Sequence, residues 1–263
     1  MTSTKQAIIH FQHPKYPISQ IKPDAPLHTP TTKLAQSYNR TSRHTTMSLQ
    51  PSLSFLTIGN PASPHTLELY LDFVCPFSAK IFVNAVDRVL KPLLTEGKYA
   101  GRVKLVIRLQ PQPWHGSSTF THEAALAVGR VAPDRFYDYA IEVRFTCPAL
   151  STPLTYTQLF KAQSEFFDIP TSTLTPLQIR EKLVSLAPEG IDRKAVGELL
   201  ELKLTPNGGV SVTDDLKYNI KLGRQNGIHV TPSALWDGLL ANDVSSSWAK
   251  DEWEQFLEAK VTA

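Results

Sequence analysis

The sequence predicts an α/β fold that carries an inserted helical domain. Two stretches with strand-like alternation flank a helical pattern between residues 67 and 109, which is the order of a βαβ unit. A long run of helical patterns follows before strand and hairpin signals return near residue 228. Because several helices in succession between strands do not continue a doubly wound sheet, they indicate an insertion.

The first strand is expected in the segment LELYLDFV, which starts at Leu67. Leucines occupy alternate positions on one face, whereas Glu68, Tyr70 and Asp72 point the other way. This period of two is typical of a β-strand.

A helix is expected directly after this strand. Apolar residues recur at four-residue spacing from Phe77, which indicates a broad apolar stripe. Pro76 suits the first helical turn, and Pro92 is expected to kink or end the helix. Residues 102–109 alternate again, so the unit should contain two parallel strands joined by a right-handed crossover.

Helix caps mark out the region that follows. Thr175 and Gln178 resemble a capping box, and Asp192 can cap the next helix. Thr213 can cap a later helix, which should end at Gly227. These signals predict a series of separate helices before the chain returns to the sheet.

The last part of the chain is expected to complete the sheet. Pro232 interrupts an apolar stretch that otherwise resembles a strand, and proline is tolerated there only at an edge, an end or a special turn. Asp237 and Gly238 form a strong hairpin signal. Ser247 is then expected to cap a final helix.

Composition and charge exclude several classes of protein. The chain has 263 residues and a formal net charge of +3, but residues 1–50 hold six of the basic residues and a single acid, Asp24. The remainder, with 21 basic and 23 acidic residues, gives no reason to expect nucleic acid as a partner. No apolar run approaches the roughly 18 residues that cross a bilayer, and two cysteines make no disulfide framework. We therefore expect a cytoplasmic protein without a membrane partner.

Residues 1–50 allow three interpretations. They are rich in Ser, Thr, Pro and His and show no lasting periodicity, which favours a disordered tail. The basic, acid-poor composition also fits a mitochondrial transit peptide, although five prolines break any amphipathic helix. The third interpretation is an extension upstream of a natural start at Met47. Mitochondrial localisation through residues 1–46 is therefore the alternative to the cytoplasm.

Two segments together resemble the DsbA-like thioredoxin-fold family. They are DFVCPFS at residues 72–78 and GIHVTPSALWDG at residues 227–238, and the resemblance covers about residues 60–260. Relatives of that family include kappa-class glutathione transferases and hydroxychromene carboxylate isomerases. The resemblance implies a thioredoxin-like fold with an inserted helical domain. The thioredoxin-like domain would comprise residues 51–116 and 210–263, with the insertion at 117–209.

The chain departs from the family pattern at three places. DsbA-type enzymes carry Cys-Pro-x-Cys, often with histidine before the second cysteine, where this chain has Phe77 and Ser78. The acid that such proteins often keep six residues before the first cysteine is replaced by Leu69. The transferase and isomerase branch typically has Ser-Pro-Tyr/Phe-Ser. This chain resembles that branch at Pro76, Phe77 and Ser78, and the oxidoreductase branch at Cys75.

Cys75 is the predicted nucleophile. A thiolate at a helix N-terminus meets free backbone N–H groups and the positive end of the helix dipole. The Ser78 hydroxyl, one turn on, is expected to donate a further hydrogen bond to the sulfur. Because serine cannot form a disulfide, Cys75 would hold a mixed disulfide until an outside thiol such as glutathione releases it. Cys147 is expected to be a free structural cysteine, and a buried, inert Cys75 is the competing interpretation.

The remaining site candidates would contact substrate. The Thr231–Pro232 bond is expected to be cis and to lie beside Cys75. This would leave the backbone of Thr231 unpaired within the sheet and facing the cleft, where an extended peptide or glutathione could hydrogen-bond to it. Trp114 and His115 follow the second strand and would line the same cleft, with a surface loop as the alternative. The predicted substrate-binding residues are Pro76, Phe77, Thr231, Pro232, Trp114 and His115. No set of residues has zinc-ligand spacing, so no metal is expected.

These features predict a single-cysteine thiol–disulfide or glutathione-linked oxidoreductase. A kappa-class-transferase-like or isomerase-like glutathione-dependent enzyme and a non-catalytic thioredoxin-fold binding module are the alternatives. The expected partner is a small-molecule thiol or a protein disulfide. No tightly bound cofactor is expected, and glutathione would serve as a co-substrate. The sequence leaves the identity of the substrate and the oligomeric state open.

Overall fold

The computed structural model describes residues 49–141, 144–145, 154–155, 160 and 162–261. Those residues all belong to one compact unit that extends from Arg43 to Ala263. The interpretations of the first 46 to 50 residues therefore fall largely outside the described residues and stay predictions. The role expected for Cys147 also falls outside them.

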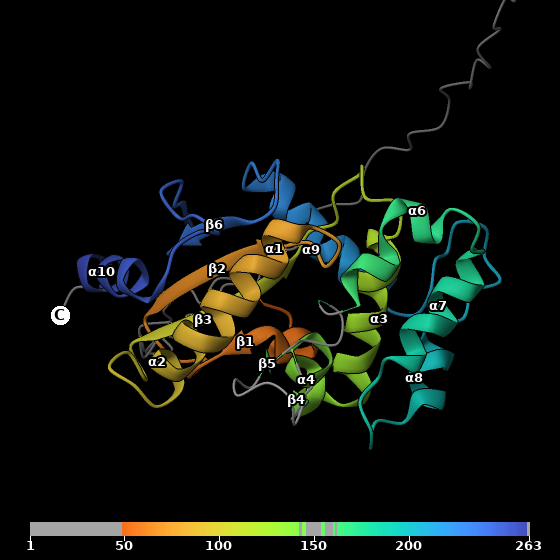
Figure 1. The fold of residues 1–263 in the computed structure, drawn as a ribbon, viewed down its shortest axis with the longest axis horizontal. Coiled ribbons are helices and arrows are strands. Elements are labelled where there is room, and N and C mark those ends of the chain that lie inside the picture. Colours follow the sequence, from red (N-terminus) through yellow and green to blue (C-terminus); the bar gives the residue numbers. More distant parts are fainter. Residues whose placement is uncertain (1–48, 142–143, 146–153, 156–159, 161, 262–263) are drawn as a thin grey trace, which may run out of the picture. The chain divides into compact units, whose positions relative to one another are not determined.

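A five-stranded sheet in the order β1-β3-β2-β6-β7 forms the centre of this unit (Figure 1). The central strand β2 (His65–Leu71) pairs in parallel with β3 (Val103–Leu109) and antiparallel with β6 (Ser233–Trp236). Strand β1 (Thr57–Ile58), which the sequence analysis missed, pairs antiparallel with β3, and β7 (Leu239–Leu240) pairs antiparallel with β6. The parallel β2–β3 pair confirms the predicted βαβ unit.

The polar face of β2 is buried as completely as its leucine face. Glu68, Tyr70 and Asp72 are each 0% exposed. Glu68 accepts a hydrogen bond of 2.8 Å from Arg108 on β3, and both side chains are fully buried. Because elements cover both faces of the strand, its polar side chains need partners inside the protein.

The first helical stretch is longer than predicted. Helix α1 (Pro76–Ile81) continues as a π-helical segment, Phe82–Leu90, and then as α2 (Lys91–Thr95). Pro92 therefore does not end the helix. It is the second residue of α2 and directly follows the wider turns of the π-helical segment.

The predicted insertion is mainly helical and contains a small two-stranded ribbon. Its described elements are α3 (Ser118–Val131), α4 (Phe136–Ile141), β4 (Arg144–Phe145), β5 (Leu154–Thr155), α6 (Asp168–Thr171), α7 (Pro176–Ser185) and α8 (Arg193–Leu199). Both halves of the capping box formed by Thr175 and Gln178 are present, and Asp192 caps α8. These two caps were predicted correctly.

Two other predicted caps are wrong. Helix α9 (Thr213–Gln225) has Val212 at its N-cap. The Thr213 hydroxyl instead accepts from the Val210 N–H at 2.8 Å and donates to Glu123 of α3 at 2.6 Å. Helix α10 (Lys250–Lys260) begins two residues after the expected position, with Ala249 at its N-cap instead of Ser247.

The C-terminal elements follow the predicted order. Asp237 and Gly238 both have positive φ angles, 47° and 86°, and form the turn between β6 and β7. Helix α10 packs against the π-helical segment, and α9 packs against β3. No helix in the described ranges is long and apolar enough to span a bilayer.

Candidate active site

Cys75 lies where the loop after β2 turns into α1. It occupies the N-cap position of α1, with Pro76 as the first helical residue. Its backbone N–H donates to the Asp72 carbonyl at 3.0 Å, and its carbonyl accepts from Ala79 N–H at 3.0 Å. The loop and the first helical turn therefore fix the cysteine, which is only 3% exposed.

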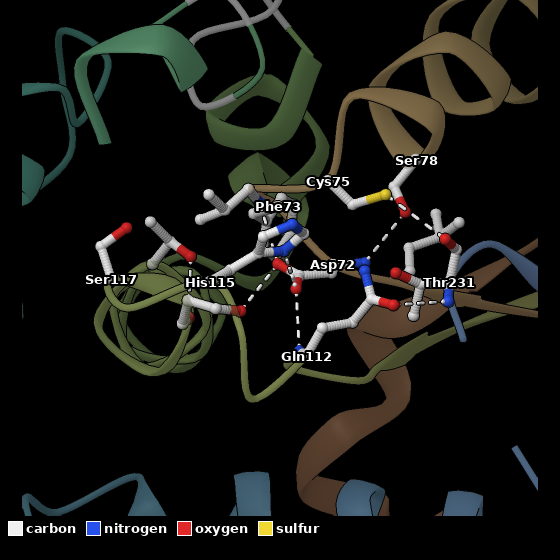
Figure 2. Close-up of polar contacts among 12 residues, drawn as sticks. Asp72, Phe73, Cys75, Ser78, Gln112, His115, Ser117 and Thr231 are labelled. Atoms are coloured by element: carbon white, nitrogen blue, oxygen red, sulfur yellow. Dashed lines mark hydrogen bonds and ion pairs between the residues drawn. The ribbon is translucent and has the colours of Figure 1, made fainter. Parts of the chain in front are cut away.

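The two segments that carry the family resemblance meet at the sulfur. The Thr231–Pro232 peptide bond is cis, as the sequence analysis predicts. Cys75 Sγ donates to the carbonyl oxygen of Thr231 at 3.3 Å, across a sequence separation of 156 residues (Figure 2). The sheet brings these residues together because Tyr70 of β2 pairs with Ser233 of β6, close to both.

The backbone of Thr231 is unpaired within the sheet, as predicted, but both of its polar groups already have partners. Its N–H donates to the side-chain oxygen of Gln112 at 3.1 Å, and its carbonyl accepts from Cys75. The residue is 6% exposed. A neighbouring side chain therefore already satisfies the backbone group that was expected to meet substrate.

Ser78 has a different partner from the one expected. Its Oγ accepts a hydrogen bond of 3.1 Å from the backbone N–H of Asp72, and its side chain is fully buried. Among the described residues, the sulfur of Cys75 is hydrogen-bonded to Thr231 and not to Ser78. Ser78 thus ties the first turn of α1 to the end of β2.

Asp72 is the centre of the polar network around this turn, and the sequence analysis missed it. Its Oδ1 accepts from Val74 N–H at 2.8 Å and from Ser118 Oγ at 2.7 Å. Its Oδ2 accepts from Gln112 N–H at 2.9 Å and pairs with His115 Nδ1 at 2.8 Å. A carboxylate that is 0% exposed needs such donors, and here they fix the loop after β3 beside the cysteine.

The sequence held a signal for this acid. The family pattern places an acid six residues before the cysteine, where this chain has Leu69. The buried acid of this site lies three residues before the cysteine. An acid at the carboxyl end of a central strand, directly before a Cys-Pro turn, is the pattern that would have identified it. Its four partners belong to three separate segments, so the sequence alone could not assign them.

His115 and Pro76 line a hollow of about 210 Å³ beside the cysteine turn. Its other lining residues are Val74, Phe167 and Asp168. The side chain of His115 is 19% exposed and is oriented by its contact with Asp72. The predicted position of His115 in a cleft is consistent with this arrangement.

Large apolar side chains are exposed next to the site residues. Trp114 is 56% exposed beside His115, and Phe77 is 62% exposed beside Pro76. Val230, 55% exposed, directly precedes Thr231. Exposed apolar groups at the border of a polar site offer contact area to a substrate.

The insertion also supports the cysteine loop. Gln163 donates from Nε2 to the carbonyls of Phe73 and Cys75, at 2.8 and 3.0 Å. Nothing in the sequence indicated this contact, because the two segments are about 90 residues apart. Among the described residues, no group of His, Cys, Asp and Glu side chains could hold a metal ion.

Comparisons with known proteins agree with this architecture at the level of the fold. A candidate protein-disulfide isomerase from Pseudomonas syringae superposes with a TM-score of 0.58 and 23% identity, over 78% of this chain and 99% of that one. The chain has a thioredoxin-like fold. It is the fold, with a helical insertion, that the resemblance to DsbA-like proteins implies.

A second solved structure gives a weaker superposition. DsbA from Chlamydia trachomatis has a TM-score of 0.48 and 19% identity, over 78% of this chain and 89% of that one. No protein-family model and no curated protein sequence matches the chain. Because one fold hosts many reactions, the function has to be inferred from the site itself.

Proposed function

We propose that the protein is a thiol–disulfide oxidoreductase in which Cys75 forms a mixed disulfide with its substrate. The contact between Cys75 Sγ and the Thr231 carbonyl carries this proposal. It brings the Cys-Pro turn and the Thr-Pro loop together at the start of a helical stretch. Backbone N–H groups at such a position stabilise a thiolate, which is the reactive form of cysteine.

The first step is an exchange of disulfide bonds. The thiol of Cys75 loses its proton to solvent and gives up its hydrogen bond to Thr231. The thiolate then attacks one sulfur of a substrate disulfide, a new S–S bond forms to Cys75, and the other substrate sulfur leaves as a thiolate. No net oxidation occurs, because one disulfide is exchanged for another.

The second step needs a thiol from outside the site. Ser78 stands where a second cysteine would resolve the intermediate, and its hydroxyl is held by the Asp72 N–H. A small-molecule thiol, most simply glutathione, would attack the substrate sulfur of the mixed disulfide and release Cys75 as a thiolate. The products are reduced Cys75 and a new disulfide between substrate and small thiol.

The border of the site would hold the substrate. Phe77 and Trp114 offer exposed apolar contacts, and Pro76 and His115 line the adjoining hollow. Thr231 and Pro232 would flank the reacting sulfur. No tightly bound cofactor is part of this proposal.

Intact-mass analysis after incubation with oxidised glutathione tests the proposal. One glutathionyl group should be added to the protein, and Cys75→Ser should abolish the addition. The control Cys147→Ser should retain it. An adduct that persists in Cys75→Ser, or no adduct on the wild type, would refute the assignment.

A second candidate is a glutathione-dependent transferase-like or isomerase-like enzyme. The hollow lined by His115, which Asp72 orients, favours it, because a histidine could accept the proton of a bound thiol there. Glutathione would then bind without a covalent bond to Cys75. Tight glutathione binding that survives Cys75→Ser would support this candidate over the first.

A further inference from the structure

Gln112 joins two parts of the candidate site. It lies in the loop after β3, and its backbone N–H donates to Asp72 Oδ2 at 2.9 Å. Its side-chain oxygen accepts from the Thr231 N–H at 3.1 Å. The backbone of Gln112 is thus anchored to Asp72. Its side-chain amide is enclosed by protein, because the residue is only 5% exposed.

The Thr231 backbone lies outside the ladder of the sheet. The pairing of β6 with β2 begins at Ser233, so the N–H and carbonyl of Thr231 are not used between strands. We call these two groups the Thr231 dock. An extended peptide that adds to a sheet edge would bond to such groups with its own backbone amides.

The side chain of Gln112 already pairs with the N–H that such a peptide would use. Its carboxamide oxygen is chemically equivalent to a backbone carbonyl, and it accepts the same N–H that a peptide would use. The carbonyl of the dock meanwhile accepts from the Cys75 thiol. A peptide could therefore enter only by displacing a buried amide that has a partner inside the protein.

We propose that Gln112 closes the Thr231 dock and makes the site selective for small disulfides over extended peptides. This inference rests on the proposed function and names its substrate class. A small disulfide needs only to reach the sulfur of Cys75, which is 3% exposed, and does not need the backbone of Thr231. A peptide would exchange one hydrogen bond for another and leave the Gln112 amide buried without its partner.

Removing the Gln112 amide tests the selectivity. Gln112→Ala should raise the rate of mixed-disulfide formation with a linear peptide disulfide roughly tenfold, since one buried hydrogen bond is worth about a factor of ten. The rate with bis(2-hydroxyethyl) disulfide should change by less than about twofold, because that small disulfide has no backbone amide and makes no use of the dock. Gln112→Asn, which keeps the amide but shortens it, should behave like Gln112→Ala. Intact mass against time gives both rates.

Gln110 provides the matched control. It lies two residues earlier, and its side-chain oxygen has no hydrogen-bond partner among the described residues and lies against Gly223 of α9. Gln110→Ala should leave the ratio of the rate with the peptide to the rate with bis(2-hydroxyethyl) disulfide unchanged. Equal acceleration of both substrates by Gln112→Ala, or a wild type that already prefers the peptide, would overturn the proposal.

A binding measurement separates this inference from the proposed function. In a Cys75→Ser background no exchange at Cys75 can occur, yet Gln112→Ala should tighten binding of a labelled cysteine-free peptide roughly tenfold by fluorescence anisotropy. Unchanged binding would refute the closed dock even if Cys75 reacts with glutathione. Tighter binding would support the dock even if the wild type formed no adduct and the proposed function failed.

Discussion

At the scale of single residues, one buried carboxylate organises the loops that surround the cysteine. Asp72 receives four hydrogen bonds, two from backbone N–H groups and two from side chains. Each donor belongs to a segment next to Cys75, so the carboxylate fixes the surroundings of the sulfur. Charge-assisted hydrogen bonds of this kind are roughly twice as strong as neutral ones.

Ser78→Cys is the sharpest test at the residue scale. The new thiol would stand one turn from Cys75 and could attack the glutathionyl adduct, forming an internal disulfide and releasing glutathione. We expect the variant to lose its adduct in mass spectra and to contain two hydrogens fewer than the reduced protein. Ser78→Ala, which has no thiol, should keep the adduct as the wild type does. A wild type that clears its adduct as fast as Ser78→Cys would mean that another thiol already resolves it.

At the scale of elements, close contacts decide where helices can pack. Gly129 of α3 faces Phe55 in the 3₁₀ turn before β1, and a Cβ at Gly129 would lie 2.3 Å from the Phe55 ring. Phe55 is 8% exposed and contacts the ring of Phe136, so it has little room to move. The glycine is therefore required by packing and not by an unusual backbone angle.

Gly129→Ala should destabilise the protein despite the better helix propensity of alanine. The propensity gain is about 1 kcal/mol, whereas overpacking costs typically 1–3 kcal/mol, so we expect a net loss of roughly 1 kcal/mol. A Cβ added at Gly197 of α8 would meet no neighbouring atom within 4 Å. Because alanine has the better helix propensity, Gly197→Ala should stabilise the protein by roughly 0.5–1 kcal/mol. Urea unfolding of both variants checks the pair. A Gly129→Ala variant more stable than the wild type would contradict the inferred clash with Phe55.

Tyr70, on the buried polar face of β2, makes the stability of the protein depend on pH in the alkaline range. Burial, and then the charge of Glu68, raise the pKa of Tyr70 to about 12, above its ordinary value of 10.0. The unfolded chain therefore releases the proton first as pH rises. Stability that is fully present below about pH 10 is lost progressively toward pH 12.

Tyr70→Phe should weaken this dependence. The variant lacks the hydroxyl that titrates, so its stability should fall less than that of the wild type between about pH 10 and pH 12. Chemical unfolding at several pH values in that range measures the difference. Parallel curves for the two proteins would show that Tyr70 titrates alike in the folded and unfolded states.

At the scale of the whole described unit, local patterns predicted the elements and long-range contacts decided the site. The sequence predicted the period-two strand at Leu67, the Cys-Pro turn and the Thr-Pro loop. The conformation of each depends mainly on residues that are neighbours in sequence. Asp72, Gln112 and Gln163 were missed because their roles arise from segments that meet only in the folded chain. Polar residues in loops carry no periodicity, so the sequence offers no pattern from which to assign their partners.

Gln163 tests whether the helical insertion supports the thiol site. Gln163→Leu keeps a similar volume but leaves the carbonyls of Phe73 and Cys75 without their donor, and we expect a loss of about 2 kcal/mol in urea unfolding. The rate at which oxidised glutathione adds to Cys75 should also fall, because the loop that carries the sulfur loses its fixed position. The exposed Gln255 of α10 serves as the control, and Gln255→Leu should change neither quantity. A Gln163→Leu protein with wild-type stability and rate would show that Gln163 is not needed to position the cysteine.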